Sequence, residues 1–355
     1  MKPFHSLSTV EQFAAHLRAE IEAGRLSGSM PGVARLVKEH GVGTRTVVEA
    51  MAELEREGLI ENRGARRRSR ILGPGLGHAR SLRVRILLYD REGRSEDYQV
   101  ELRHQLEEAG HDAVFAEKNL QDLGMHAGRV ARFVRQTPAD AWVVVSASRE
   151  VLEWFVHQPV PVFALFGRSE QMNIAATRPG KSTAMADLVG RLVELGHRRI
   201  AMMSRAERRK PTPGFIEQVF LDELKARGLP TSSFNLPDWS DDRDGFHKGL
   251  DALFRVTPPT ALLLDRPTLF MAAQQHLALR GITAPRHVSL ISMDPDPIFA
   301  WCDPPVSHVA YDSRPWVRRV LRWVANVSHG RNDRRNTETP AHFIEGGTIG
   351  PAPRS

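Results

Sequence analysis

The sequence predicts an α/β protein: a small N-terminal helical unit followed by two lobes of doubly wound parallel sheet. From residue 83 onward, short runs of apolar residues alternate with amphipathic segments, and the alternation starts again near residue 182. Continuous apolar strands separated by helices are typical of parallel sheets covered by helices on both faces. Ahead of them, two short helical patterns are joined by a glycine, and a stretch rich in glycine and proline follows.

The N-terminal unit begins with two short helices separated by a turn. Pro31 opens an apolar-periodic segment that Gly41 ends, and a second segment keeps helical spacing at Val47, Met51 and Leu54. This arrangement predicts a helix-turn-helix, whose second helix normally enters the DNA major groove.

The polar start of the second helix supplies the candidate DNA contacts. Thr44, Arg45 and Thr46 lie on the side opposite the apolar positions, so we expect them to reach base edges. We add Arg35, from the preceding helix, to the candidate DNA-contacting residues.

Five arginines lie between residues 62 and 71, directly after the second helix. Their position, together with a formal charge of +7, favours contact with a polyanion. The alternative is a solvated basic linker. We take as phosphate or minor-groove contacts Arg63, Arg66, Arg67 and Arg68.

Residues 9–72 resemble the winged helix-turn-helix of the GntR family of bacterial repressors. The matching pieces are a first helix over residues 9–23, Met30-Pro31, and the stretch VGTRTVVEAMAELEREGLI. The resemblance places the arginine-rich segment at the tip of a β-wing. Gly43-Thr44 and Val33-Ala34 depart from the family pattern, which leaves the base-reading pattern open.

Length and composition predict further domains and an intracellular setting. The 355 residues exceed what one small DNA-binding domain needs, and the single Cys302 gives neither a disulfide framework nor a thiolate zinc cluster. No apolar run is long enough to span a membrane, and no signal peptide precedes the chain, so the expected location is the cytoplasm. We divide the chain into a DNA-binding domain (1–72), a hinge linker (73–81) and a two-lobed domain (82–355).

The elements of the two lobes follow from the apolar pattern. In the first lobe, we expect strands over residues 83–89, 112–116, 140–146 and 160–166, with helices over 98–109, 128–136 and 151–156. In the second lobe, we expect strands over 199–203, 259–264 and 288–293, with helices over 182–195, 215–227, 267–280 and 315–328.

Residues 82–349 resemble the effector-binding domain of the LacI family, which has the fold of periplasmic sugar-binding proteins. The likeness lies in LVELGHRRIA (192–201), PTAL (259–262), GITAPRHVSLISMD (281–294) and PPVSHV (304–309). In that family a small ligand binds between the lobes, and dimer contacts come from the lobe faces. The resemblance therefore implies a homodimer and a cleft at the carboxyl ends of the strands.

The candidate ligand contacts follow those strand ends. Asp294 keeps a carboxylate of the family that accepts ligand hydroxyls. Arg266 and Tyr311 replace other residues of that pattern. The remaining candidates end strands of the first lobe: Asp90, Arg91, Ser146, Ser148 and Arg168.

Arg266 leaves the class of ligand open. A guanidinium pairs bidentately with carboxylates and phosphates, so a sugar acid or a phosphorylated sugar is as plausible as a neutral sugar. The alternative is an Arg266 that pairs with Asp294 or Asp265 across a closed, empty cleft.

Enzyme classes find little support in the sequence. Gly180-Lys181-Ser182-Thr183 resembles the end of a phosphate loop, but the first glycine is missing and Arg178-Pro179 is expected to interrupt the preceding strand. The chain after residue 80 is too short for an aminotransferase-like domain and shows no context for a cofactor-binding lysine. Its strands argue against a helical metal-binding domain, and the histidines lack ligand spacing. We assign no cofactor and no metal.

These observations predict a DNA-binding transcriptional regulator, a repressor of a double-stranded operator, that responds to a small ligand such as a sugar or sugar derivative. The alternative is a DNA-binding protein whose cleft has lost its ligand and serves only dimerisation.

Overall fold

A computed structural model describes residues 9–22, 25–26, 28–56, 59–62, 64, 68–71 and 80–353. The chain forms two compact units, Met1–Leu82 with Val324–Asp333 and Arg83–Trp323 with Arg334–Ser355. Residues 73–79 of the expected linker lie outside the described residues.

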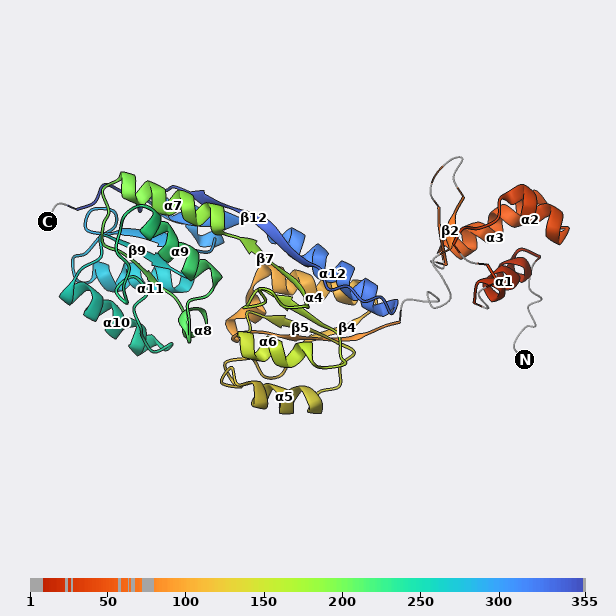
Figure 1. Cartoon of the computed structure of the whole chain (residues 1–355), viewed down its shortest axis with the longest axis horizontal. Coiled ribbons are helices and arrows are strands. Elements are labelled where there is room, and N and C mark those ends of the chain that lie inside the picture. The colour runs from red at the N-terminus through yellow and green to blue at the C-terminus, as the bar shows by residue number, and fades with distance from the viewer. Residues whose placement is uncertain are drawn as a thin grey trace. The chain divides into compact units, whose positions relative to one another are not determined.

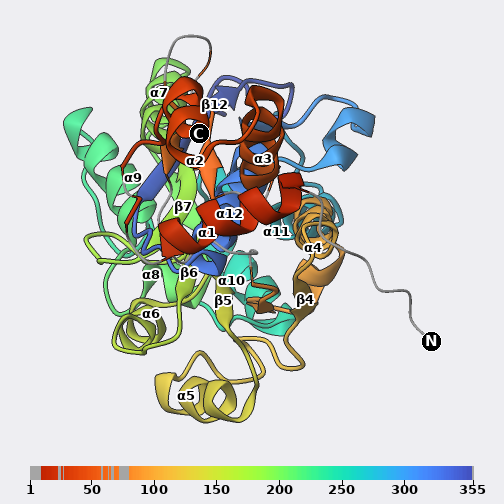
Figure 2. The same ribbon diagram turned by 90° about the vertical axis from the view of Figure 1, so that its right-hand side faces the viewer.

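The N-terminal unit has the predicted winged helix-turn-helix fold. It contains α1 (Thr9–Glu22), α2 (Val33–His40), α3 (Thr44–Arg56), β1 (Ile60–Glu61) and β2 (Arg70–Ile71). Figure 2 shows α1 lying across α2 and α3. The three helices and the β1–β2 pair share one core, in which Leu17, Leu36 and Leu54 are fully buried.

Gly41 sets the turn between α2 and α3. Its φ of 64° is left-handed, and its N–H donates to the carbonyl of Val37, which closes the last turn of α2. Glycine adopts this conformation without the steric cost that a Cβ imposes. The turn places the first residues of α3 at the surface, while Val47 and Ala50 pack inward.

The large unit is built on one ten-stranded sheet in the order β4-β3-β5-β6-β7-β12-β11-β10-β9-β8. Every neighbouring pair is parallel except β11 and β12. The strands of the first lobe are β3 (Arg83–Leu87), β4 (Asp112–Phe115), β5 (Ala141–Val145), β6 (Val162–Leu165) and β7 (Ala175–Gly180). Those of the second are β8 (Ile200–Met203), β9 (Ala261–Leu264), β10 (Ser289–Ser292) and β11 (Ser307–Tyr311).

The strand β12 (Asn336–Ile344) belongs to both lobes. Its first half pairs with β7 and its second half with β11. Figure 1 shows β7 and β12 side by side where the two lobes meet. The lobes are therefore joined by a continuous strand as well as by the chain connections.

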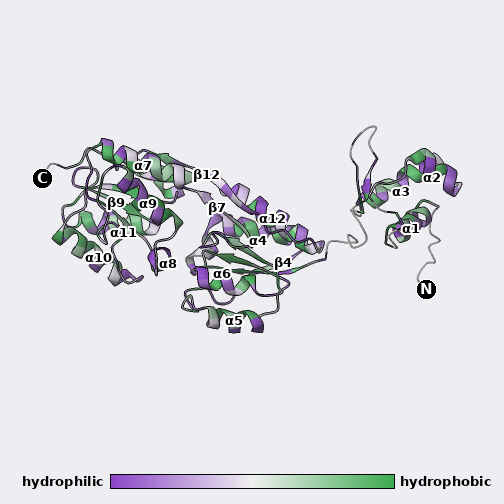
Figure 3. Ribbon diagram, viewed as in Figure 1, coloured by the Kyte–Doolittle hydropathy of each residue, from purple (hydrophilic) through white to green (hydrophobic). Residues whose placement is uncertain are grey.

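Helices cover both faces of each lobe, as the sequence predicts. In the first lobe, α5 (Ala127–Gln136) and α6 (Arg149–Val156) pack on one face. On the other, Trp323 of α12 (Arg314–Ser328) contacts Phe163 of β6, and α4 (Asp97–Glu108) contacts β4. Figure 3 shows these helices with one hydrophobic and one hydrophilic side.

The second lobe shows the same two-sided packing in its strand alternation. Met202 and Leu263 face the core under α7 (Ser182–Glu194) and α9 (Phe215–Ala226). Met203 and Leu264, one position on, face the core under α10 (Arg243–Val256) and α11 (Pro267–Ala278). Strands buried on both faces need apolar residues at consecutive positions, which explains their continuous apolar runs.

The sequence analysis missed five α-helices and strands: β7, β11, β12, α10 and α8 (Ala206–Arg209). The expectation that Arg178-Pro179 interrupts the strand before Gly180 is wrong, because β7 continues to Gly180. The pairing of β7 with β6 ends at Thr177, whereas Pro179 faces β12 alone. A proline at the open side of a strand removes no ladder hydrogen bond there.

Candidate functional site

The candidate DNA-contacting face lies at the start of α3. Thr44 and Arg45 are exposed and Thr46 is half-buried. The Arg45 side chain is 92 % exposed and its Nε lies 2.8 Å from Oε1 of Glu49. Arg35 on α2 makes the same kind of exposed pair with Glu39, at 2.7 Å. Exposed pairs of this spacing contribute little to stability, so both guanidinium groups are available to another partner.

The wing is only partly described. Arg68 is exposed beside β2, whereas Arg63, Arg66 and Arg67 lie outside the described residues. Their contact with DNA stays a prediction.

A cavity of about 920 Å³ lies between the two lobes, at the carboxyl ends of the strands. Segments directly after β3, β5 and β6 line it from the first lobe, and segments after β8, β9 and β10 line it from the second. This is the location expected for a ligand in an open α/β sheet.

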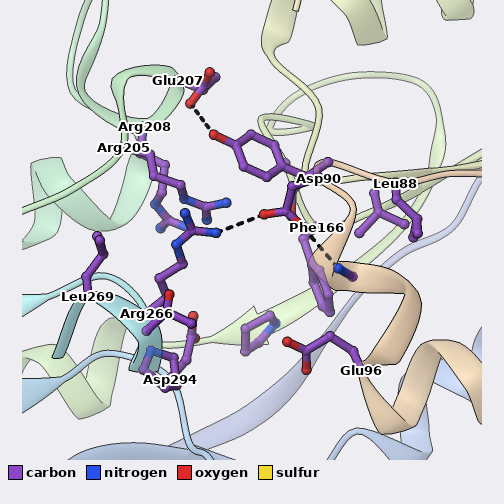
Figure 4. Close-up of a pocket in the computed structure, with 18 of the residues that line it drawn as sticks. Leu88, Asp90, Glu96, Phe166, Arg205, Glu207, Arg208, Arg266, Leu269 and Asp294 are labelled. Atoms are coloured by element: carbon purple, nitrogen blue, oxygen red, sulfur yellow. Dashed lines mark hydrogen bonds and ion pairs between the residues drawn. The ribbon is translucent and has the colours of Figure 1, made fainter. Parts of the chain in front are cut away.

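An ion pair joins the lobes across this cavity. Nη1 of Arg266 lies 2.8 Å from Oδ2 of Asp90, whose other oxygen accepts the N–H of Gly93 at 3.0 Å. Figure 4 shows the pair between the two walls. Arg266 therefore does pair with a carboxylate across the cleft, but its partner is Asp90 of the first lobe and not Asp294 or Asp265.

Two further contacts join the same walls. The hydroxyl of Tyr89 donates to Glu207 at 3.0 Å, and the guanidinium of Arg205 lies 4.5 Å from the centre of the Tyr89 ring. Arg168 donates to the carbonyls of Lys210 and Pro213, at 2.9 and 3.1 Å. Side chains of the first lobe thus make direct contacts with the second lobe at several points along the cleft.

The other arginines of this wall have partners within the second lobe. Nε of Arg205 lies 3.0 Å from Asp265, and Nε of Arg208 lies 2.7 Å from Glu217. Burial would raise the pKa of Asp265, but the charges of Arg205 and Arg208 outweigh it and lower the pKa. Figure 4 shows the guanidinium groups of Arg205, Arg208 and Arg266 gathered on one side of the cavity.

Asp294 lies at the other end of the cavity with Tyr311 and Lys181. Oδ1 of Asp294 accepts hydrogen bonds from the Tyr311 hydroxyl and from the Lys181 ammonium group, which also donates to the carbonyl of Met293 at 2.8 Å. Burial lowers the pKa of Lys181, and the charge of Asp294 opposes that shift. Nothing in the described part of the chain bonds Oδ2 of Asp294.

The cavity brings together six of the eight predicted ligand residues: Asp90, Ser146, Arg168, Arg266, Asp294 and Tyr311. Arg91 and Ser148 are not among the lining residues. Arg91 is exposed and lies 3.6 Å from Asp122, and the Ser148 hydroxyl accepts the N–H of Val151 at the start of α6.

Sequence reasoning missed several residues of the cleft. Lys181 was considered only as part of a phosphate-loop-like stretch, whereas its ammonium group binds Asp294. Glu96, Arg205 and Arg208 were not singled out. A serine three residues before an apolar helical position is a common helix cap, and that signal could have identified the role of Ser148.

Comparisons with known families match both parts of the chain. Residues 9–68 match the bacterial regulatory proteins of the gntR family, and residues 189–349 match the periplasmic binding protein-like domain. None of the curated proteins matches the chain.

Solved structures share the fold at low sequence identity. A LacI family transcriptional regulator from Enterococcus faecium with bound ribose has a TM-score of 0.60 and 15 % identity, covering 76 % of this chain and 98 % of its own. The lac repressor dimer bound to operator and the anti-inducer ONPF has a TM-score of 0.59 and 14 % sequence identity. The match covers 76 % of this chain and 95 % of the repressor chain. The transcriptional regulator CelR in complex with cellobiose has a TM-score of 0.62 and 16 % sequence identity. The match covers 90 % of this chain and 100 % of the CelR chain.

The predicted combination of domains is confirmed by these matches. In the described part of the chain, no helix has the length and apolar character needed to cross a membrane. The chain joins a helix-turn-helix domain of the bacterial gntR type to a periplasmic binding protein-like domain with the fold of LacI family regulators.

Proposed function

We propose that the protein is a DNA-binding transcriptional repressor whose operator affinity changes when a small ligand binds between the lobes. The observation that carries this proposal is the polar cavity at the strand ends, in a chain that also contains a gntR-type domain. Nothing in this role requires chemical turnover, and we propose a regulator, not an enzyme.

Asp294 supports a ligand that carries hydroxyl groups. Its Oδ1 is occupied by Lys181 and Tyr311, which leaves Oδ2 to accept a hydroxyl proton. The relatives solved with ribose and with cellobiose hold hydroxylated ligands. Arg266 gives weaker support for an anionic ligand than its sequence suggests, because Asp90 already balances its charge.

The contacts across the cleft favour a second candidate function. Arg266–Asp90 and Tyr89–Glu207 join the two walls directly. The same contacts would serve a domain whose cleft has no ligand and which acts only in dimerisation. Ligand screening separates the two functions.

A homodimer fits the proposed role, because one helix-turn-helix reads too few base pairs to define a genomic site. Trp301, at the end of the short helix η2 (Pro297–Trp301), is 85 % exposed, and Ile298 one turn earlier is 45 % exposed. Phe299 of the same helix is buried and packs on Phe270 of α11. We propose that this apolar surface contributes to the subunit interface.

Ligand binding and operator binding are then coupled through the arrangement of the two lobes. A ligand that favours one arrangement of the lobes changes the separation of the two recognition helices in the dimer. Such couplings are typically worth about 1–3 kcal/mol.

Arg45→Ala should weaken binding to the specific operator by about 1–3 kcal/mol and relax base preference at one position, because the lost guanidinium contacts a base edge. Affinity for operator variants and for random DNA is the measurement. Arg56→Ala, at the other end of α3, is the matched control and should change neither the operator affinity nor the base preference. Equal losses on specific and random DNA would show that Arg45 contacts only phosphate.

A ligand of the cleft should stabilise the protein against heat. At ~100 times its dissociation constant, a bound ligand adds about 2.7 kcal/mol to the free energy of unfolding. Asp294→Asn should remove most of the shift that a hydroxylated sugar produces, whereas Asp122→Asn, outside the cavity, should retain it. Neutral and anionic sugars that all leave the melting temperature unchanged would favour the dimerisation function.

Trp301→Glu should convert dimers to monomers, because a buried carboxylate at an apolar contact is strongly disfavoured. Light scattering after size-exclusion chromatography measures the mass, and operator titration should show a matching loss of affinity. Trp301→Phe should remain dimeric. A Trp301→Glu protein that stays dimeric at micromolar concentration would place the interface elsewhere.

A further inference from the structure

The charges around the cavity are unevenly compensated. Ten carboxylates and seven Lys or Arg side chains line it. On the arginine side, each of Arg205, Arg208 and Arg266 has its own carboxylate partner. The excess of negative charge therefore lies on other parts of the lining.

Glu96, Asp294 and Asp296 lie near one another in the lining. Asp294 shares its charge with Lys181, but neither Glu96 nor Asp296 has a salt-bridge partner in the described part of the chain. Partial burial raises the pKa of Glu96, and the nearby charges of Asp296 and Asp294 raise it further. Figure 4 shows Glu96 across the cavity from Arg205 and Arg208. The Lys181 ammonium group is engaged by Asp294, so Glu96 and Asp296 are left without a paired cation in the described part of the chain.

Aromatic side chains form the wall beside these carboxylates. The ring of Trp316 lies 5.7 Å from that of Tyr98, 4.6 Å from that of Phe166 and 5.0 Å from that of Tyr311, measured between centroids. All four residues line the cavity, and the Tyr311 hydroxyl binds Asp294. Aromatic faces next to carboxylates attract organic cations.

One buried polar group on this wall lacks a hydrogen bond. Nε1 of Trp316, which is 2 % exposed, has no partner within the described residues. Buried polar groups are normally satisfied, so this donor in the lining indicates a bound molecule with an acceptor atom.

We propose that the cleft binds a hydroxylated organic amine, as in an amino sugar, with its ammonium group between Glu96 and Asp296 beside the Tyr98–Trp316 wall. The inference rests on the proposed function, since it assigns a chemical class to the ligand of the same cleft. Hydroxyl groups of the ligand meet Asp294 and the Trp316 indole. Arg205, Arg208 and Arg266 each have a carboxylate partner, so these arginines do not require an anionic group on the ligand.

Calorimetric titration of the full-length protein tests this proposal. The probes are glucosamine, galactosamine and mannosamine, each paired with its neutral parent sugar. At least one amine should bind tenfold or more tightly than its parent. Glu96→Gln and Asp296→Asn should each weaken amine binding about tenfold and leave the neutral parent within twofold. Asn at 296 keeps the acceptor that Asp296 offers to the Ile298 N–H at 2.8 Å.

Glu101→Gln, on the exposed side of the same helix, is the matched control and should bind the amine as the unchanged protein does. Equal binding of an amine and its parent, no binding of any amine, or amine affinity unaffected by Glu96→Gln would each overturn the proposal. A neutral or anionic sugar that changes operator affinity would overturn it while leaving the proposed function intact. An amine that binds without changing operator affinity would support the assignment and contradict the regulatory role.

Discussion

The ion pair between Asp90 and Arg266 is the interaction on which the arrangement of the cleft depends. Asp90 follows β3 of the first lobe and Arg266 follows β9 of the second, so separating the lobes breaks it. The side chains are 10 % and 29 % exposed, and breaking such a pair leaves two poorly solvated charges. The pair also balances the charge of Arg266, whereas Glu96 and Asp296 have no salt-bridge partner in the described part of the chain.

Most of the fold could be predicted because parallel strands buried on both faces need continuous apolar runs. The stretches AWVVV, ALLL and SLIS are such strands. Two of the three missed strands carry a different pattern: β7 contains Arg178 and Pro179, and β12 alternates exposed with buried positions because it joins the two lobes. The helix α10 was missed because glycines interrupt its apolar spacing, although Phe246 and Leu250 are buried.

The candidate site was less predictable, because its chemistry depends on which charges pair across the cleft. A strand end identified Asp90, and the family resemblance identified Arg266 and Asp294, as lining residues, but no local pattern shows that Asp90 is the partner of Arg266. Lys181 is a further case, since its neighbours in sequence resemble a phosphate loop while its partner lies more than a hundred positions along the chain. Tertiary pairing of this kind decides whether a charged residue is free to bind a ligand.

A double-mutant cycle on Asp90 and Arg266 tests most directly whether lobe contacts control DNA binding. The measured quantity is the affinity of the full-length protein for an operator selected from random DNA. If the pair sets the lobe arrangement, Asp90→Asn and Arg266→Gln should change operator affinity in the same direction. The double variant should then be no further changed than either single one, because both remove the same interaction. Additive effects, or operator affinity unchanged in all three variants, would contradict the account.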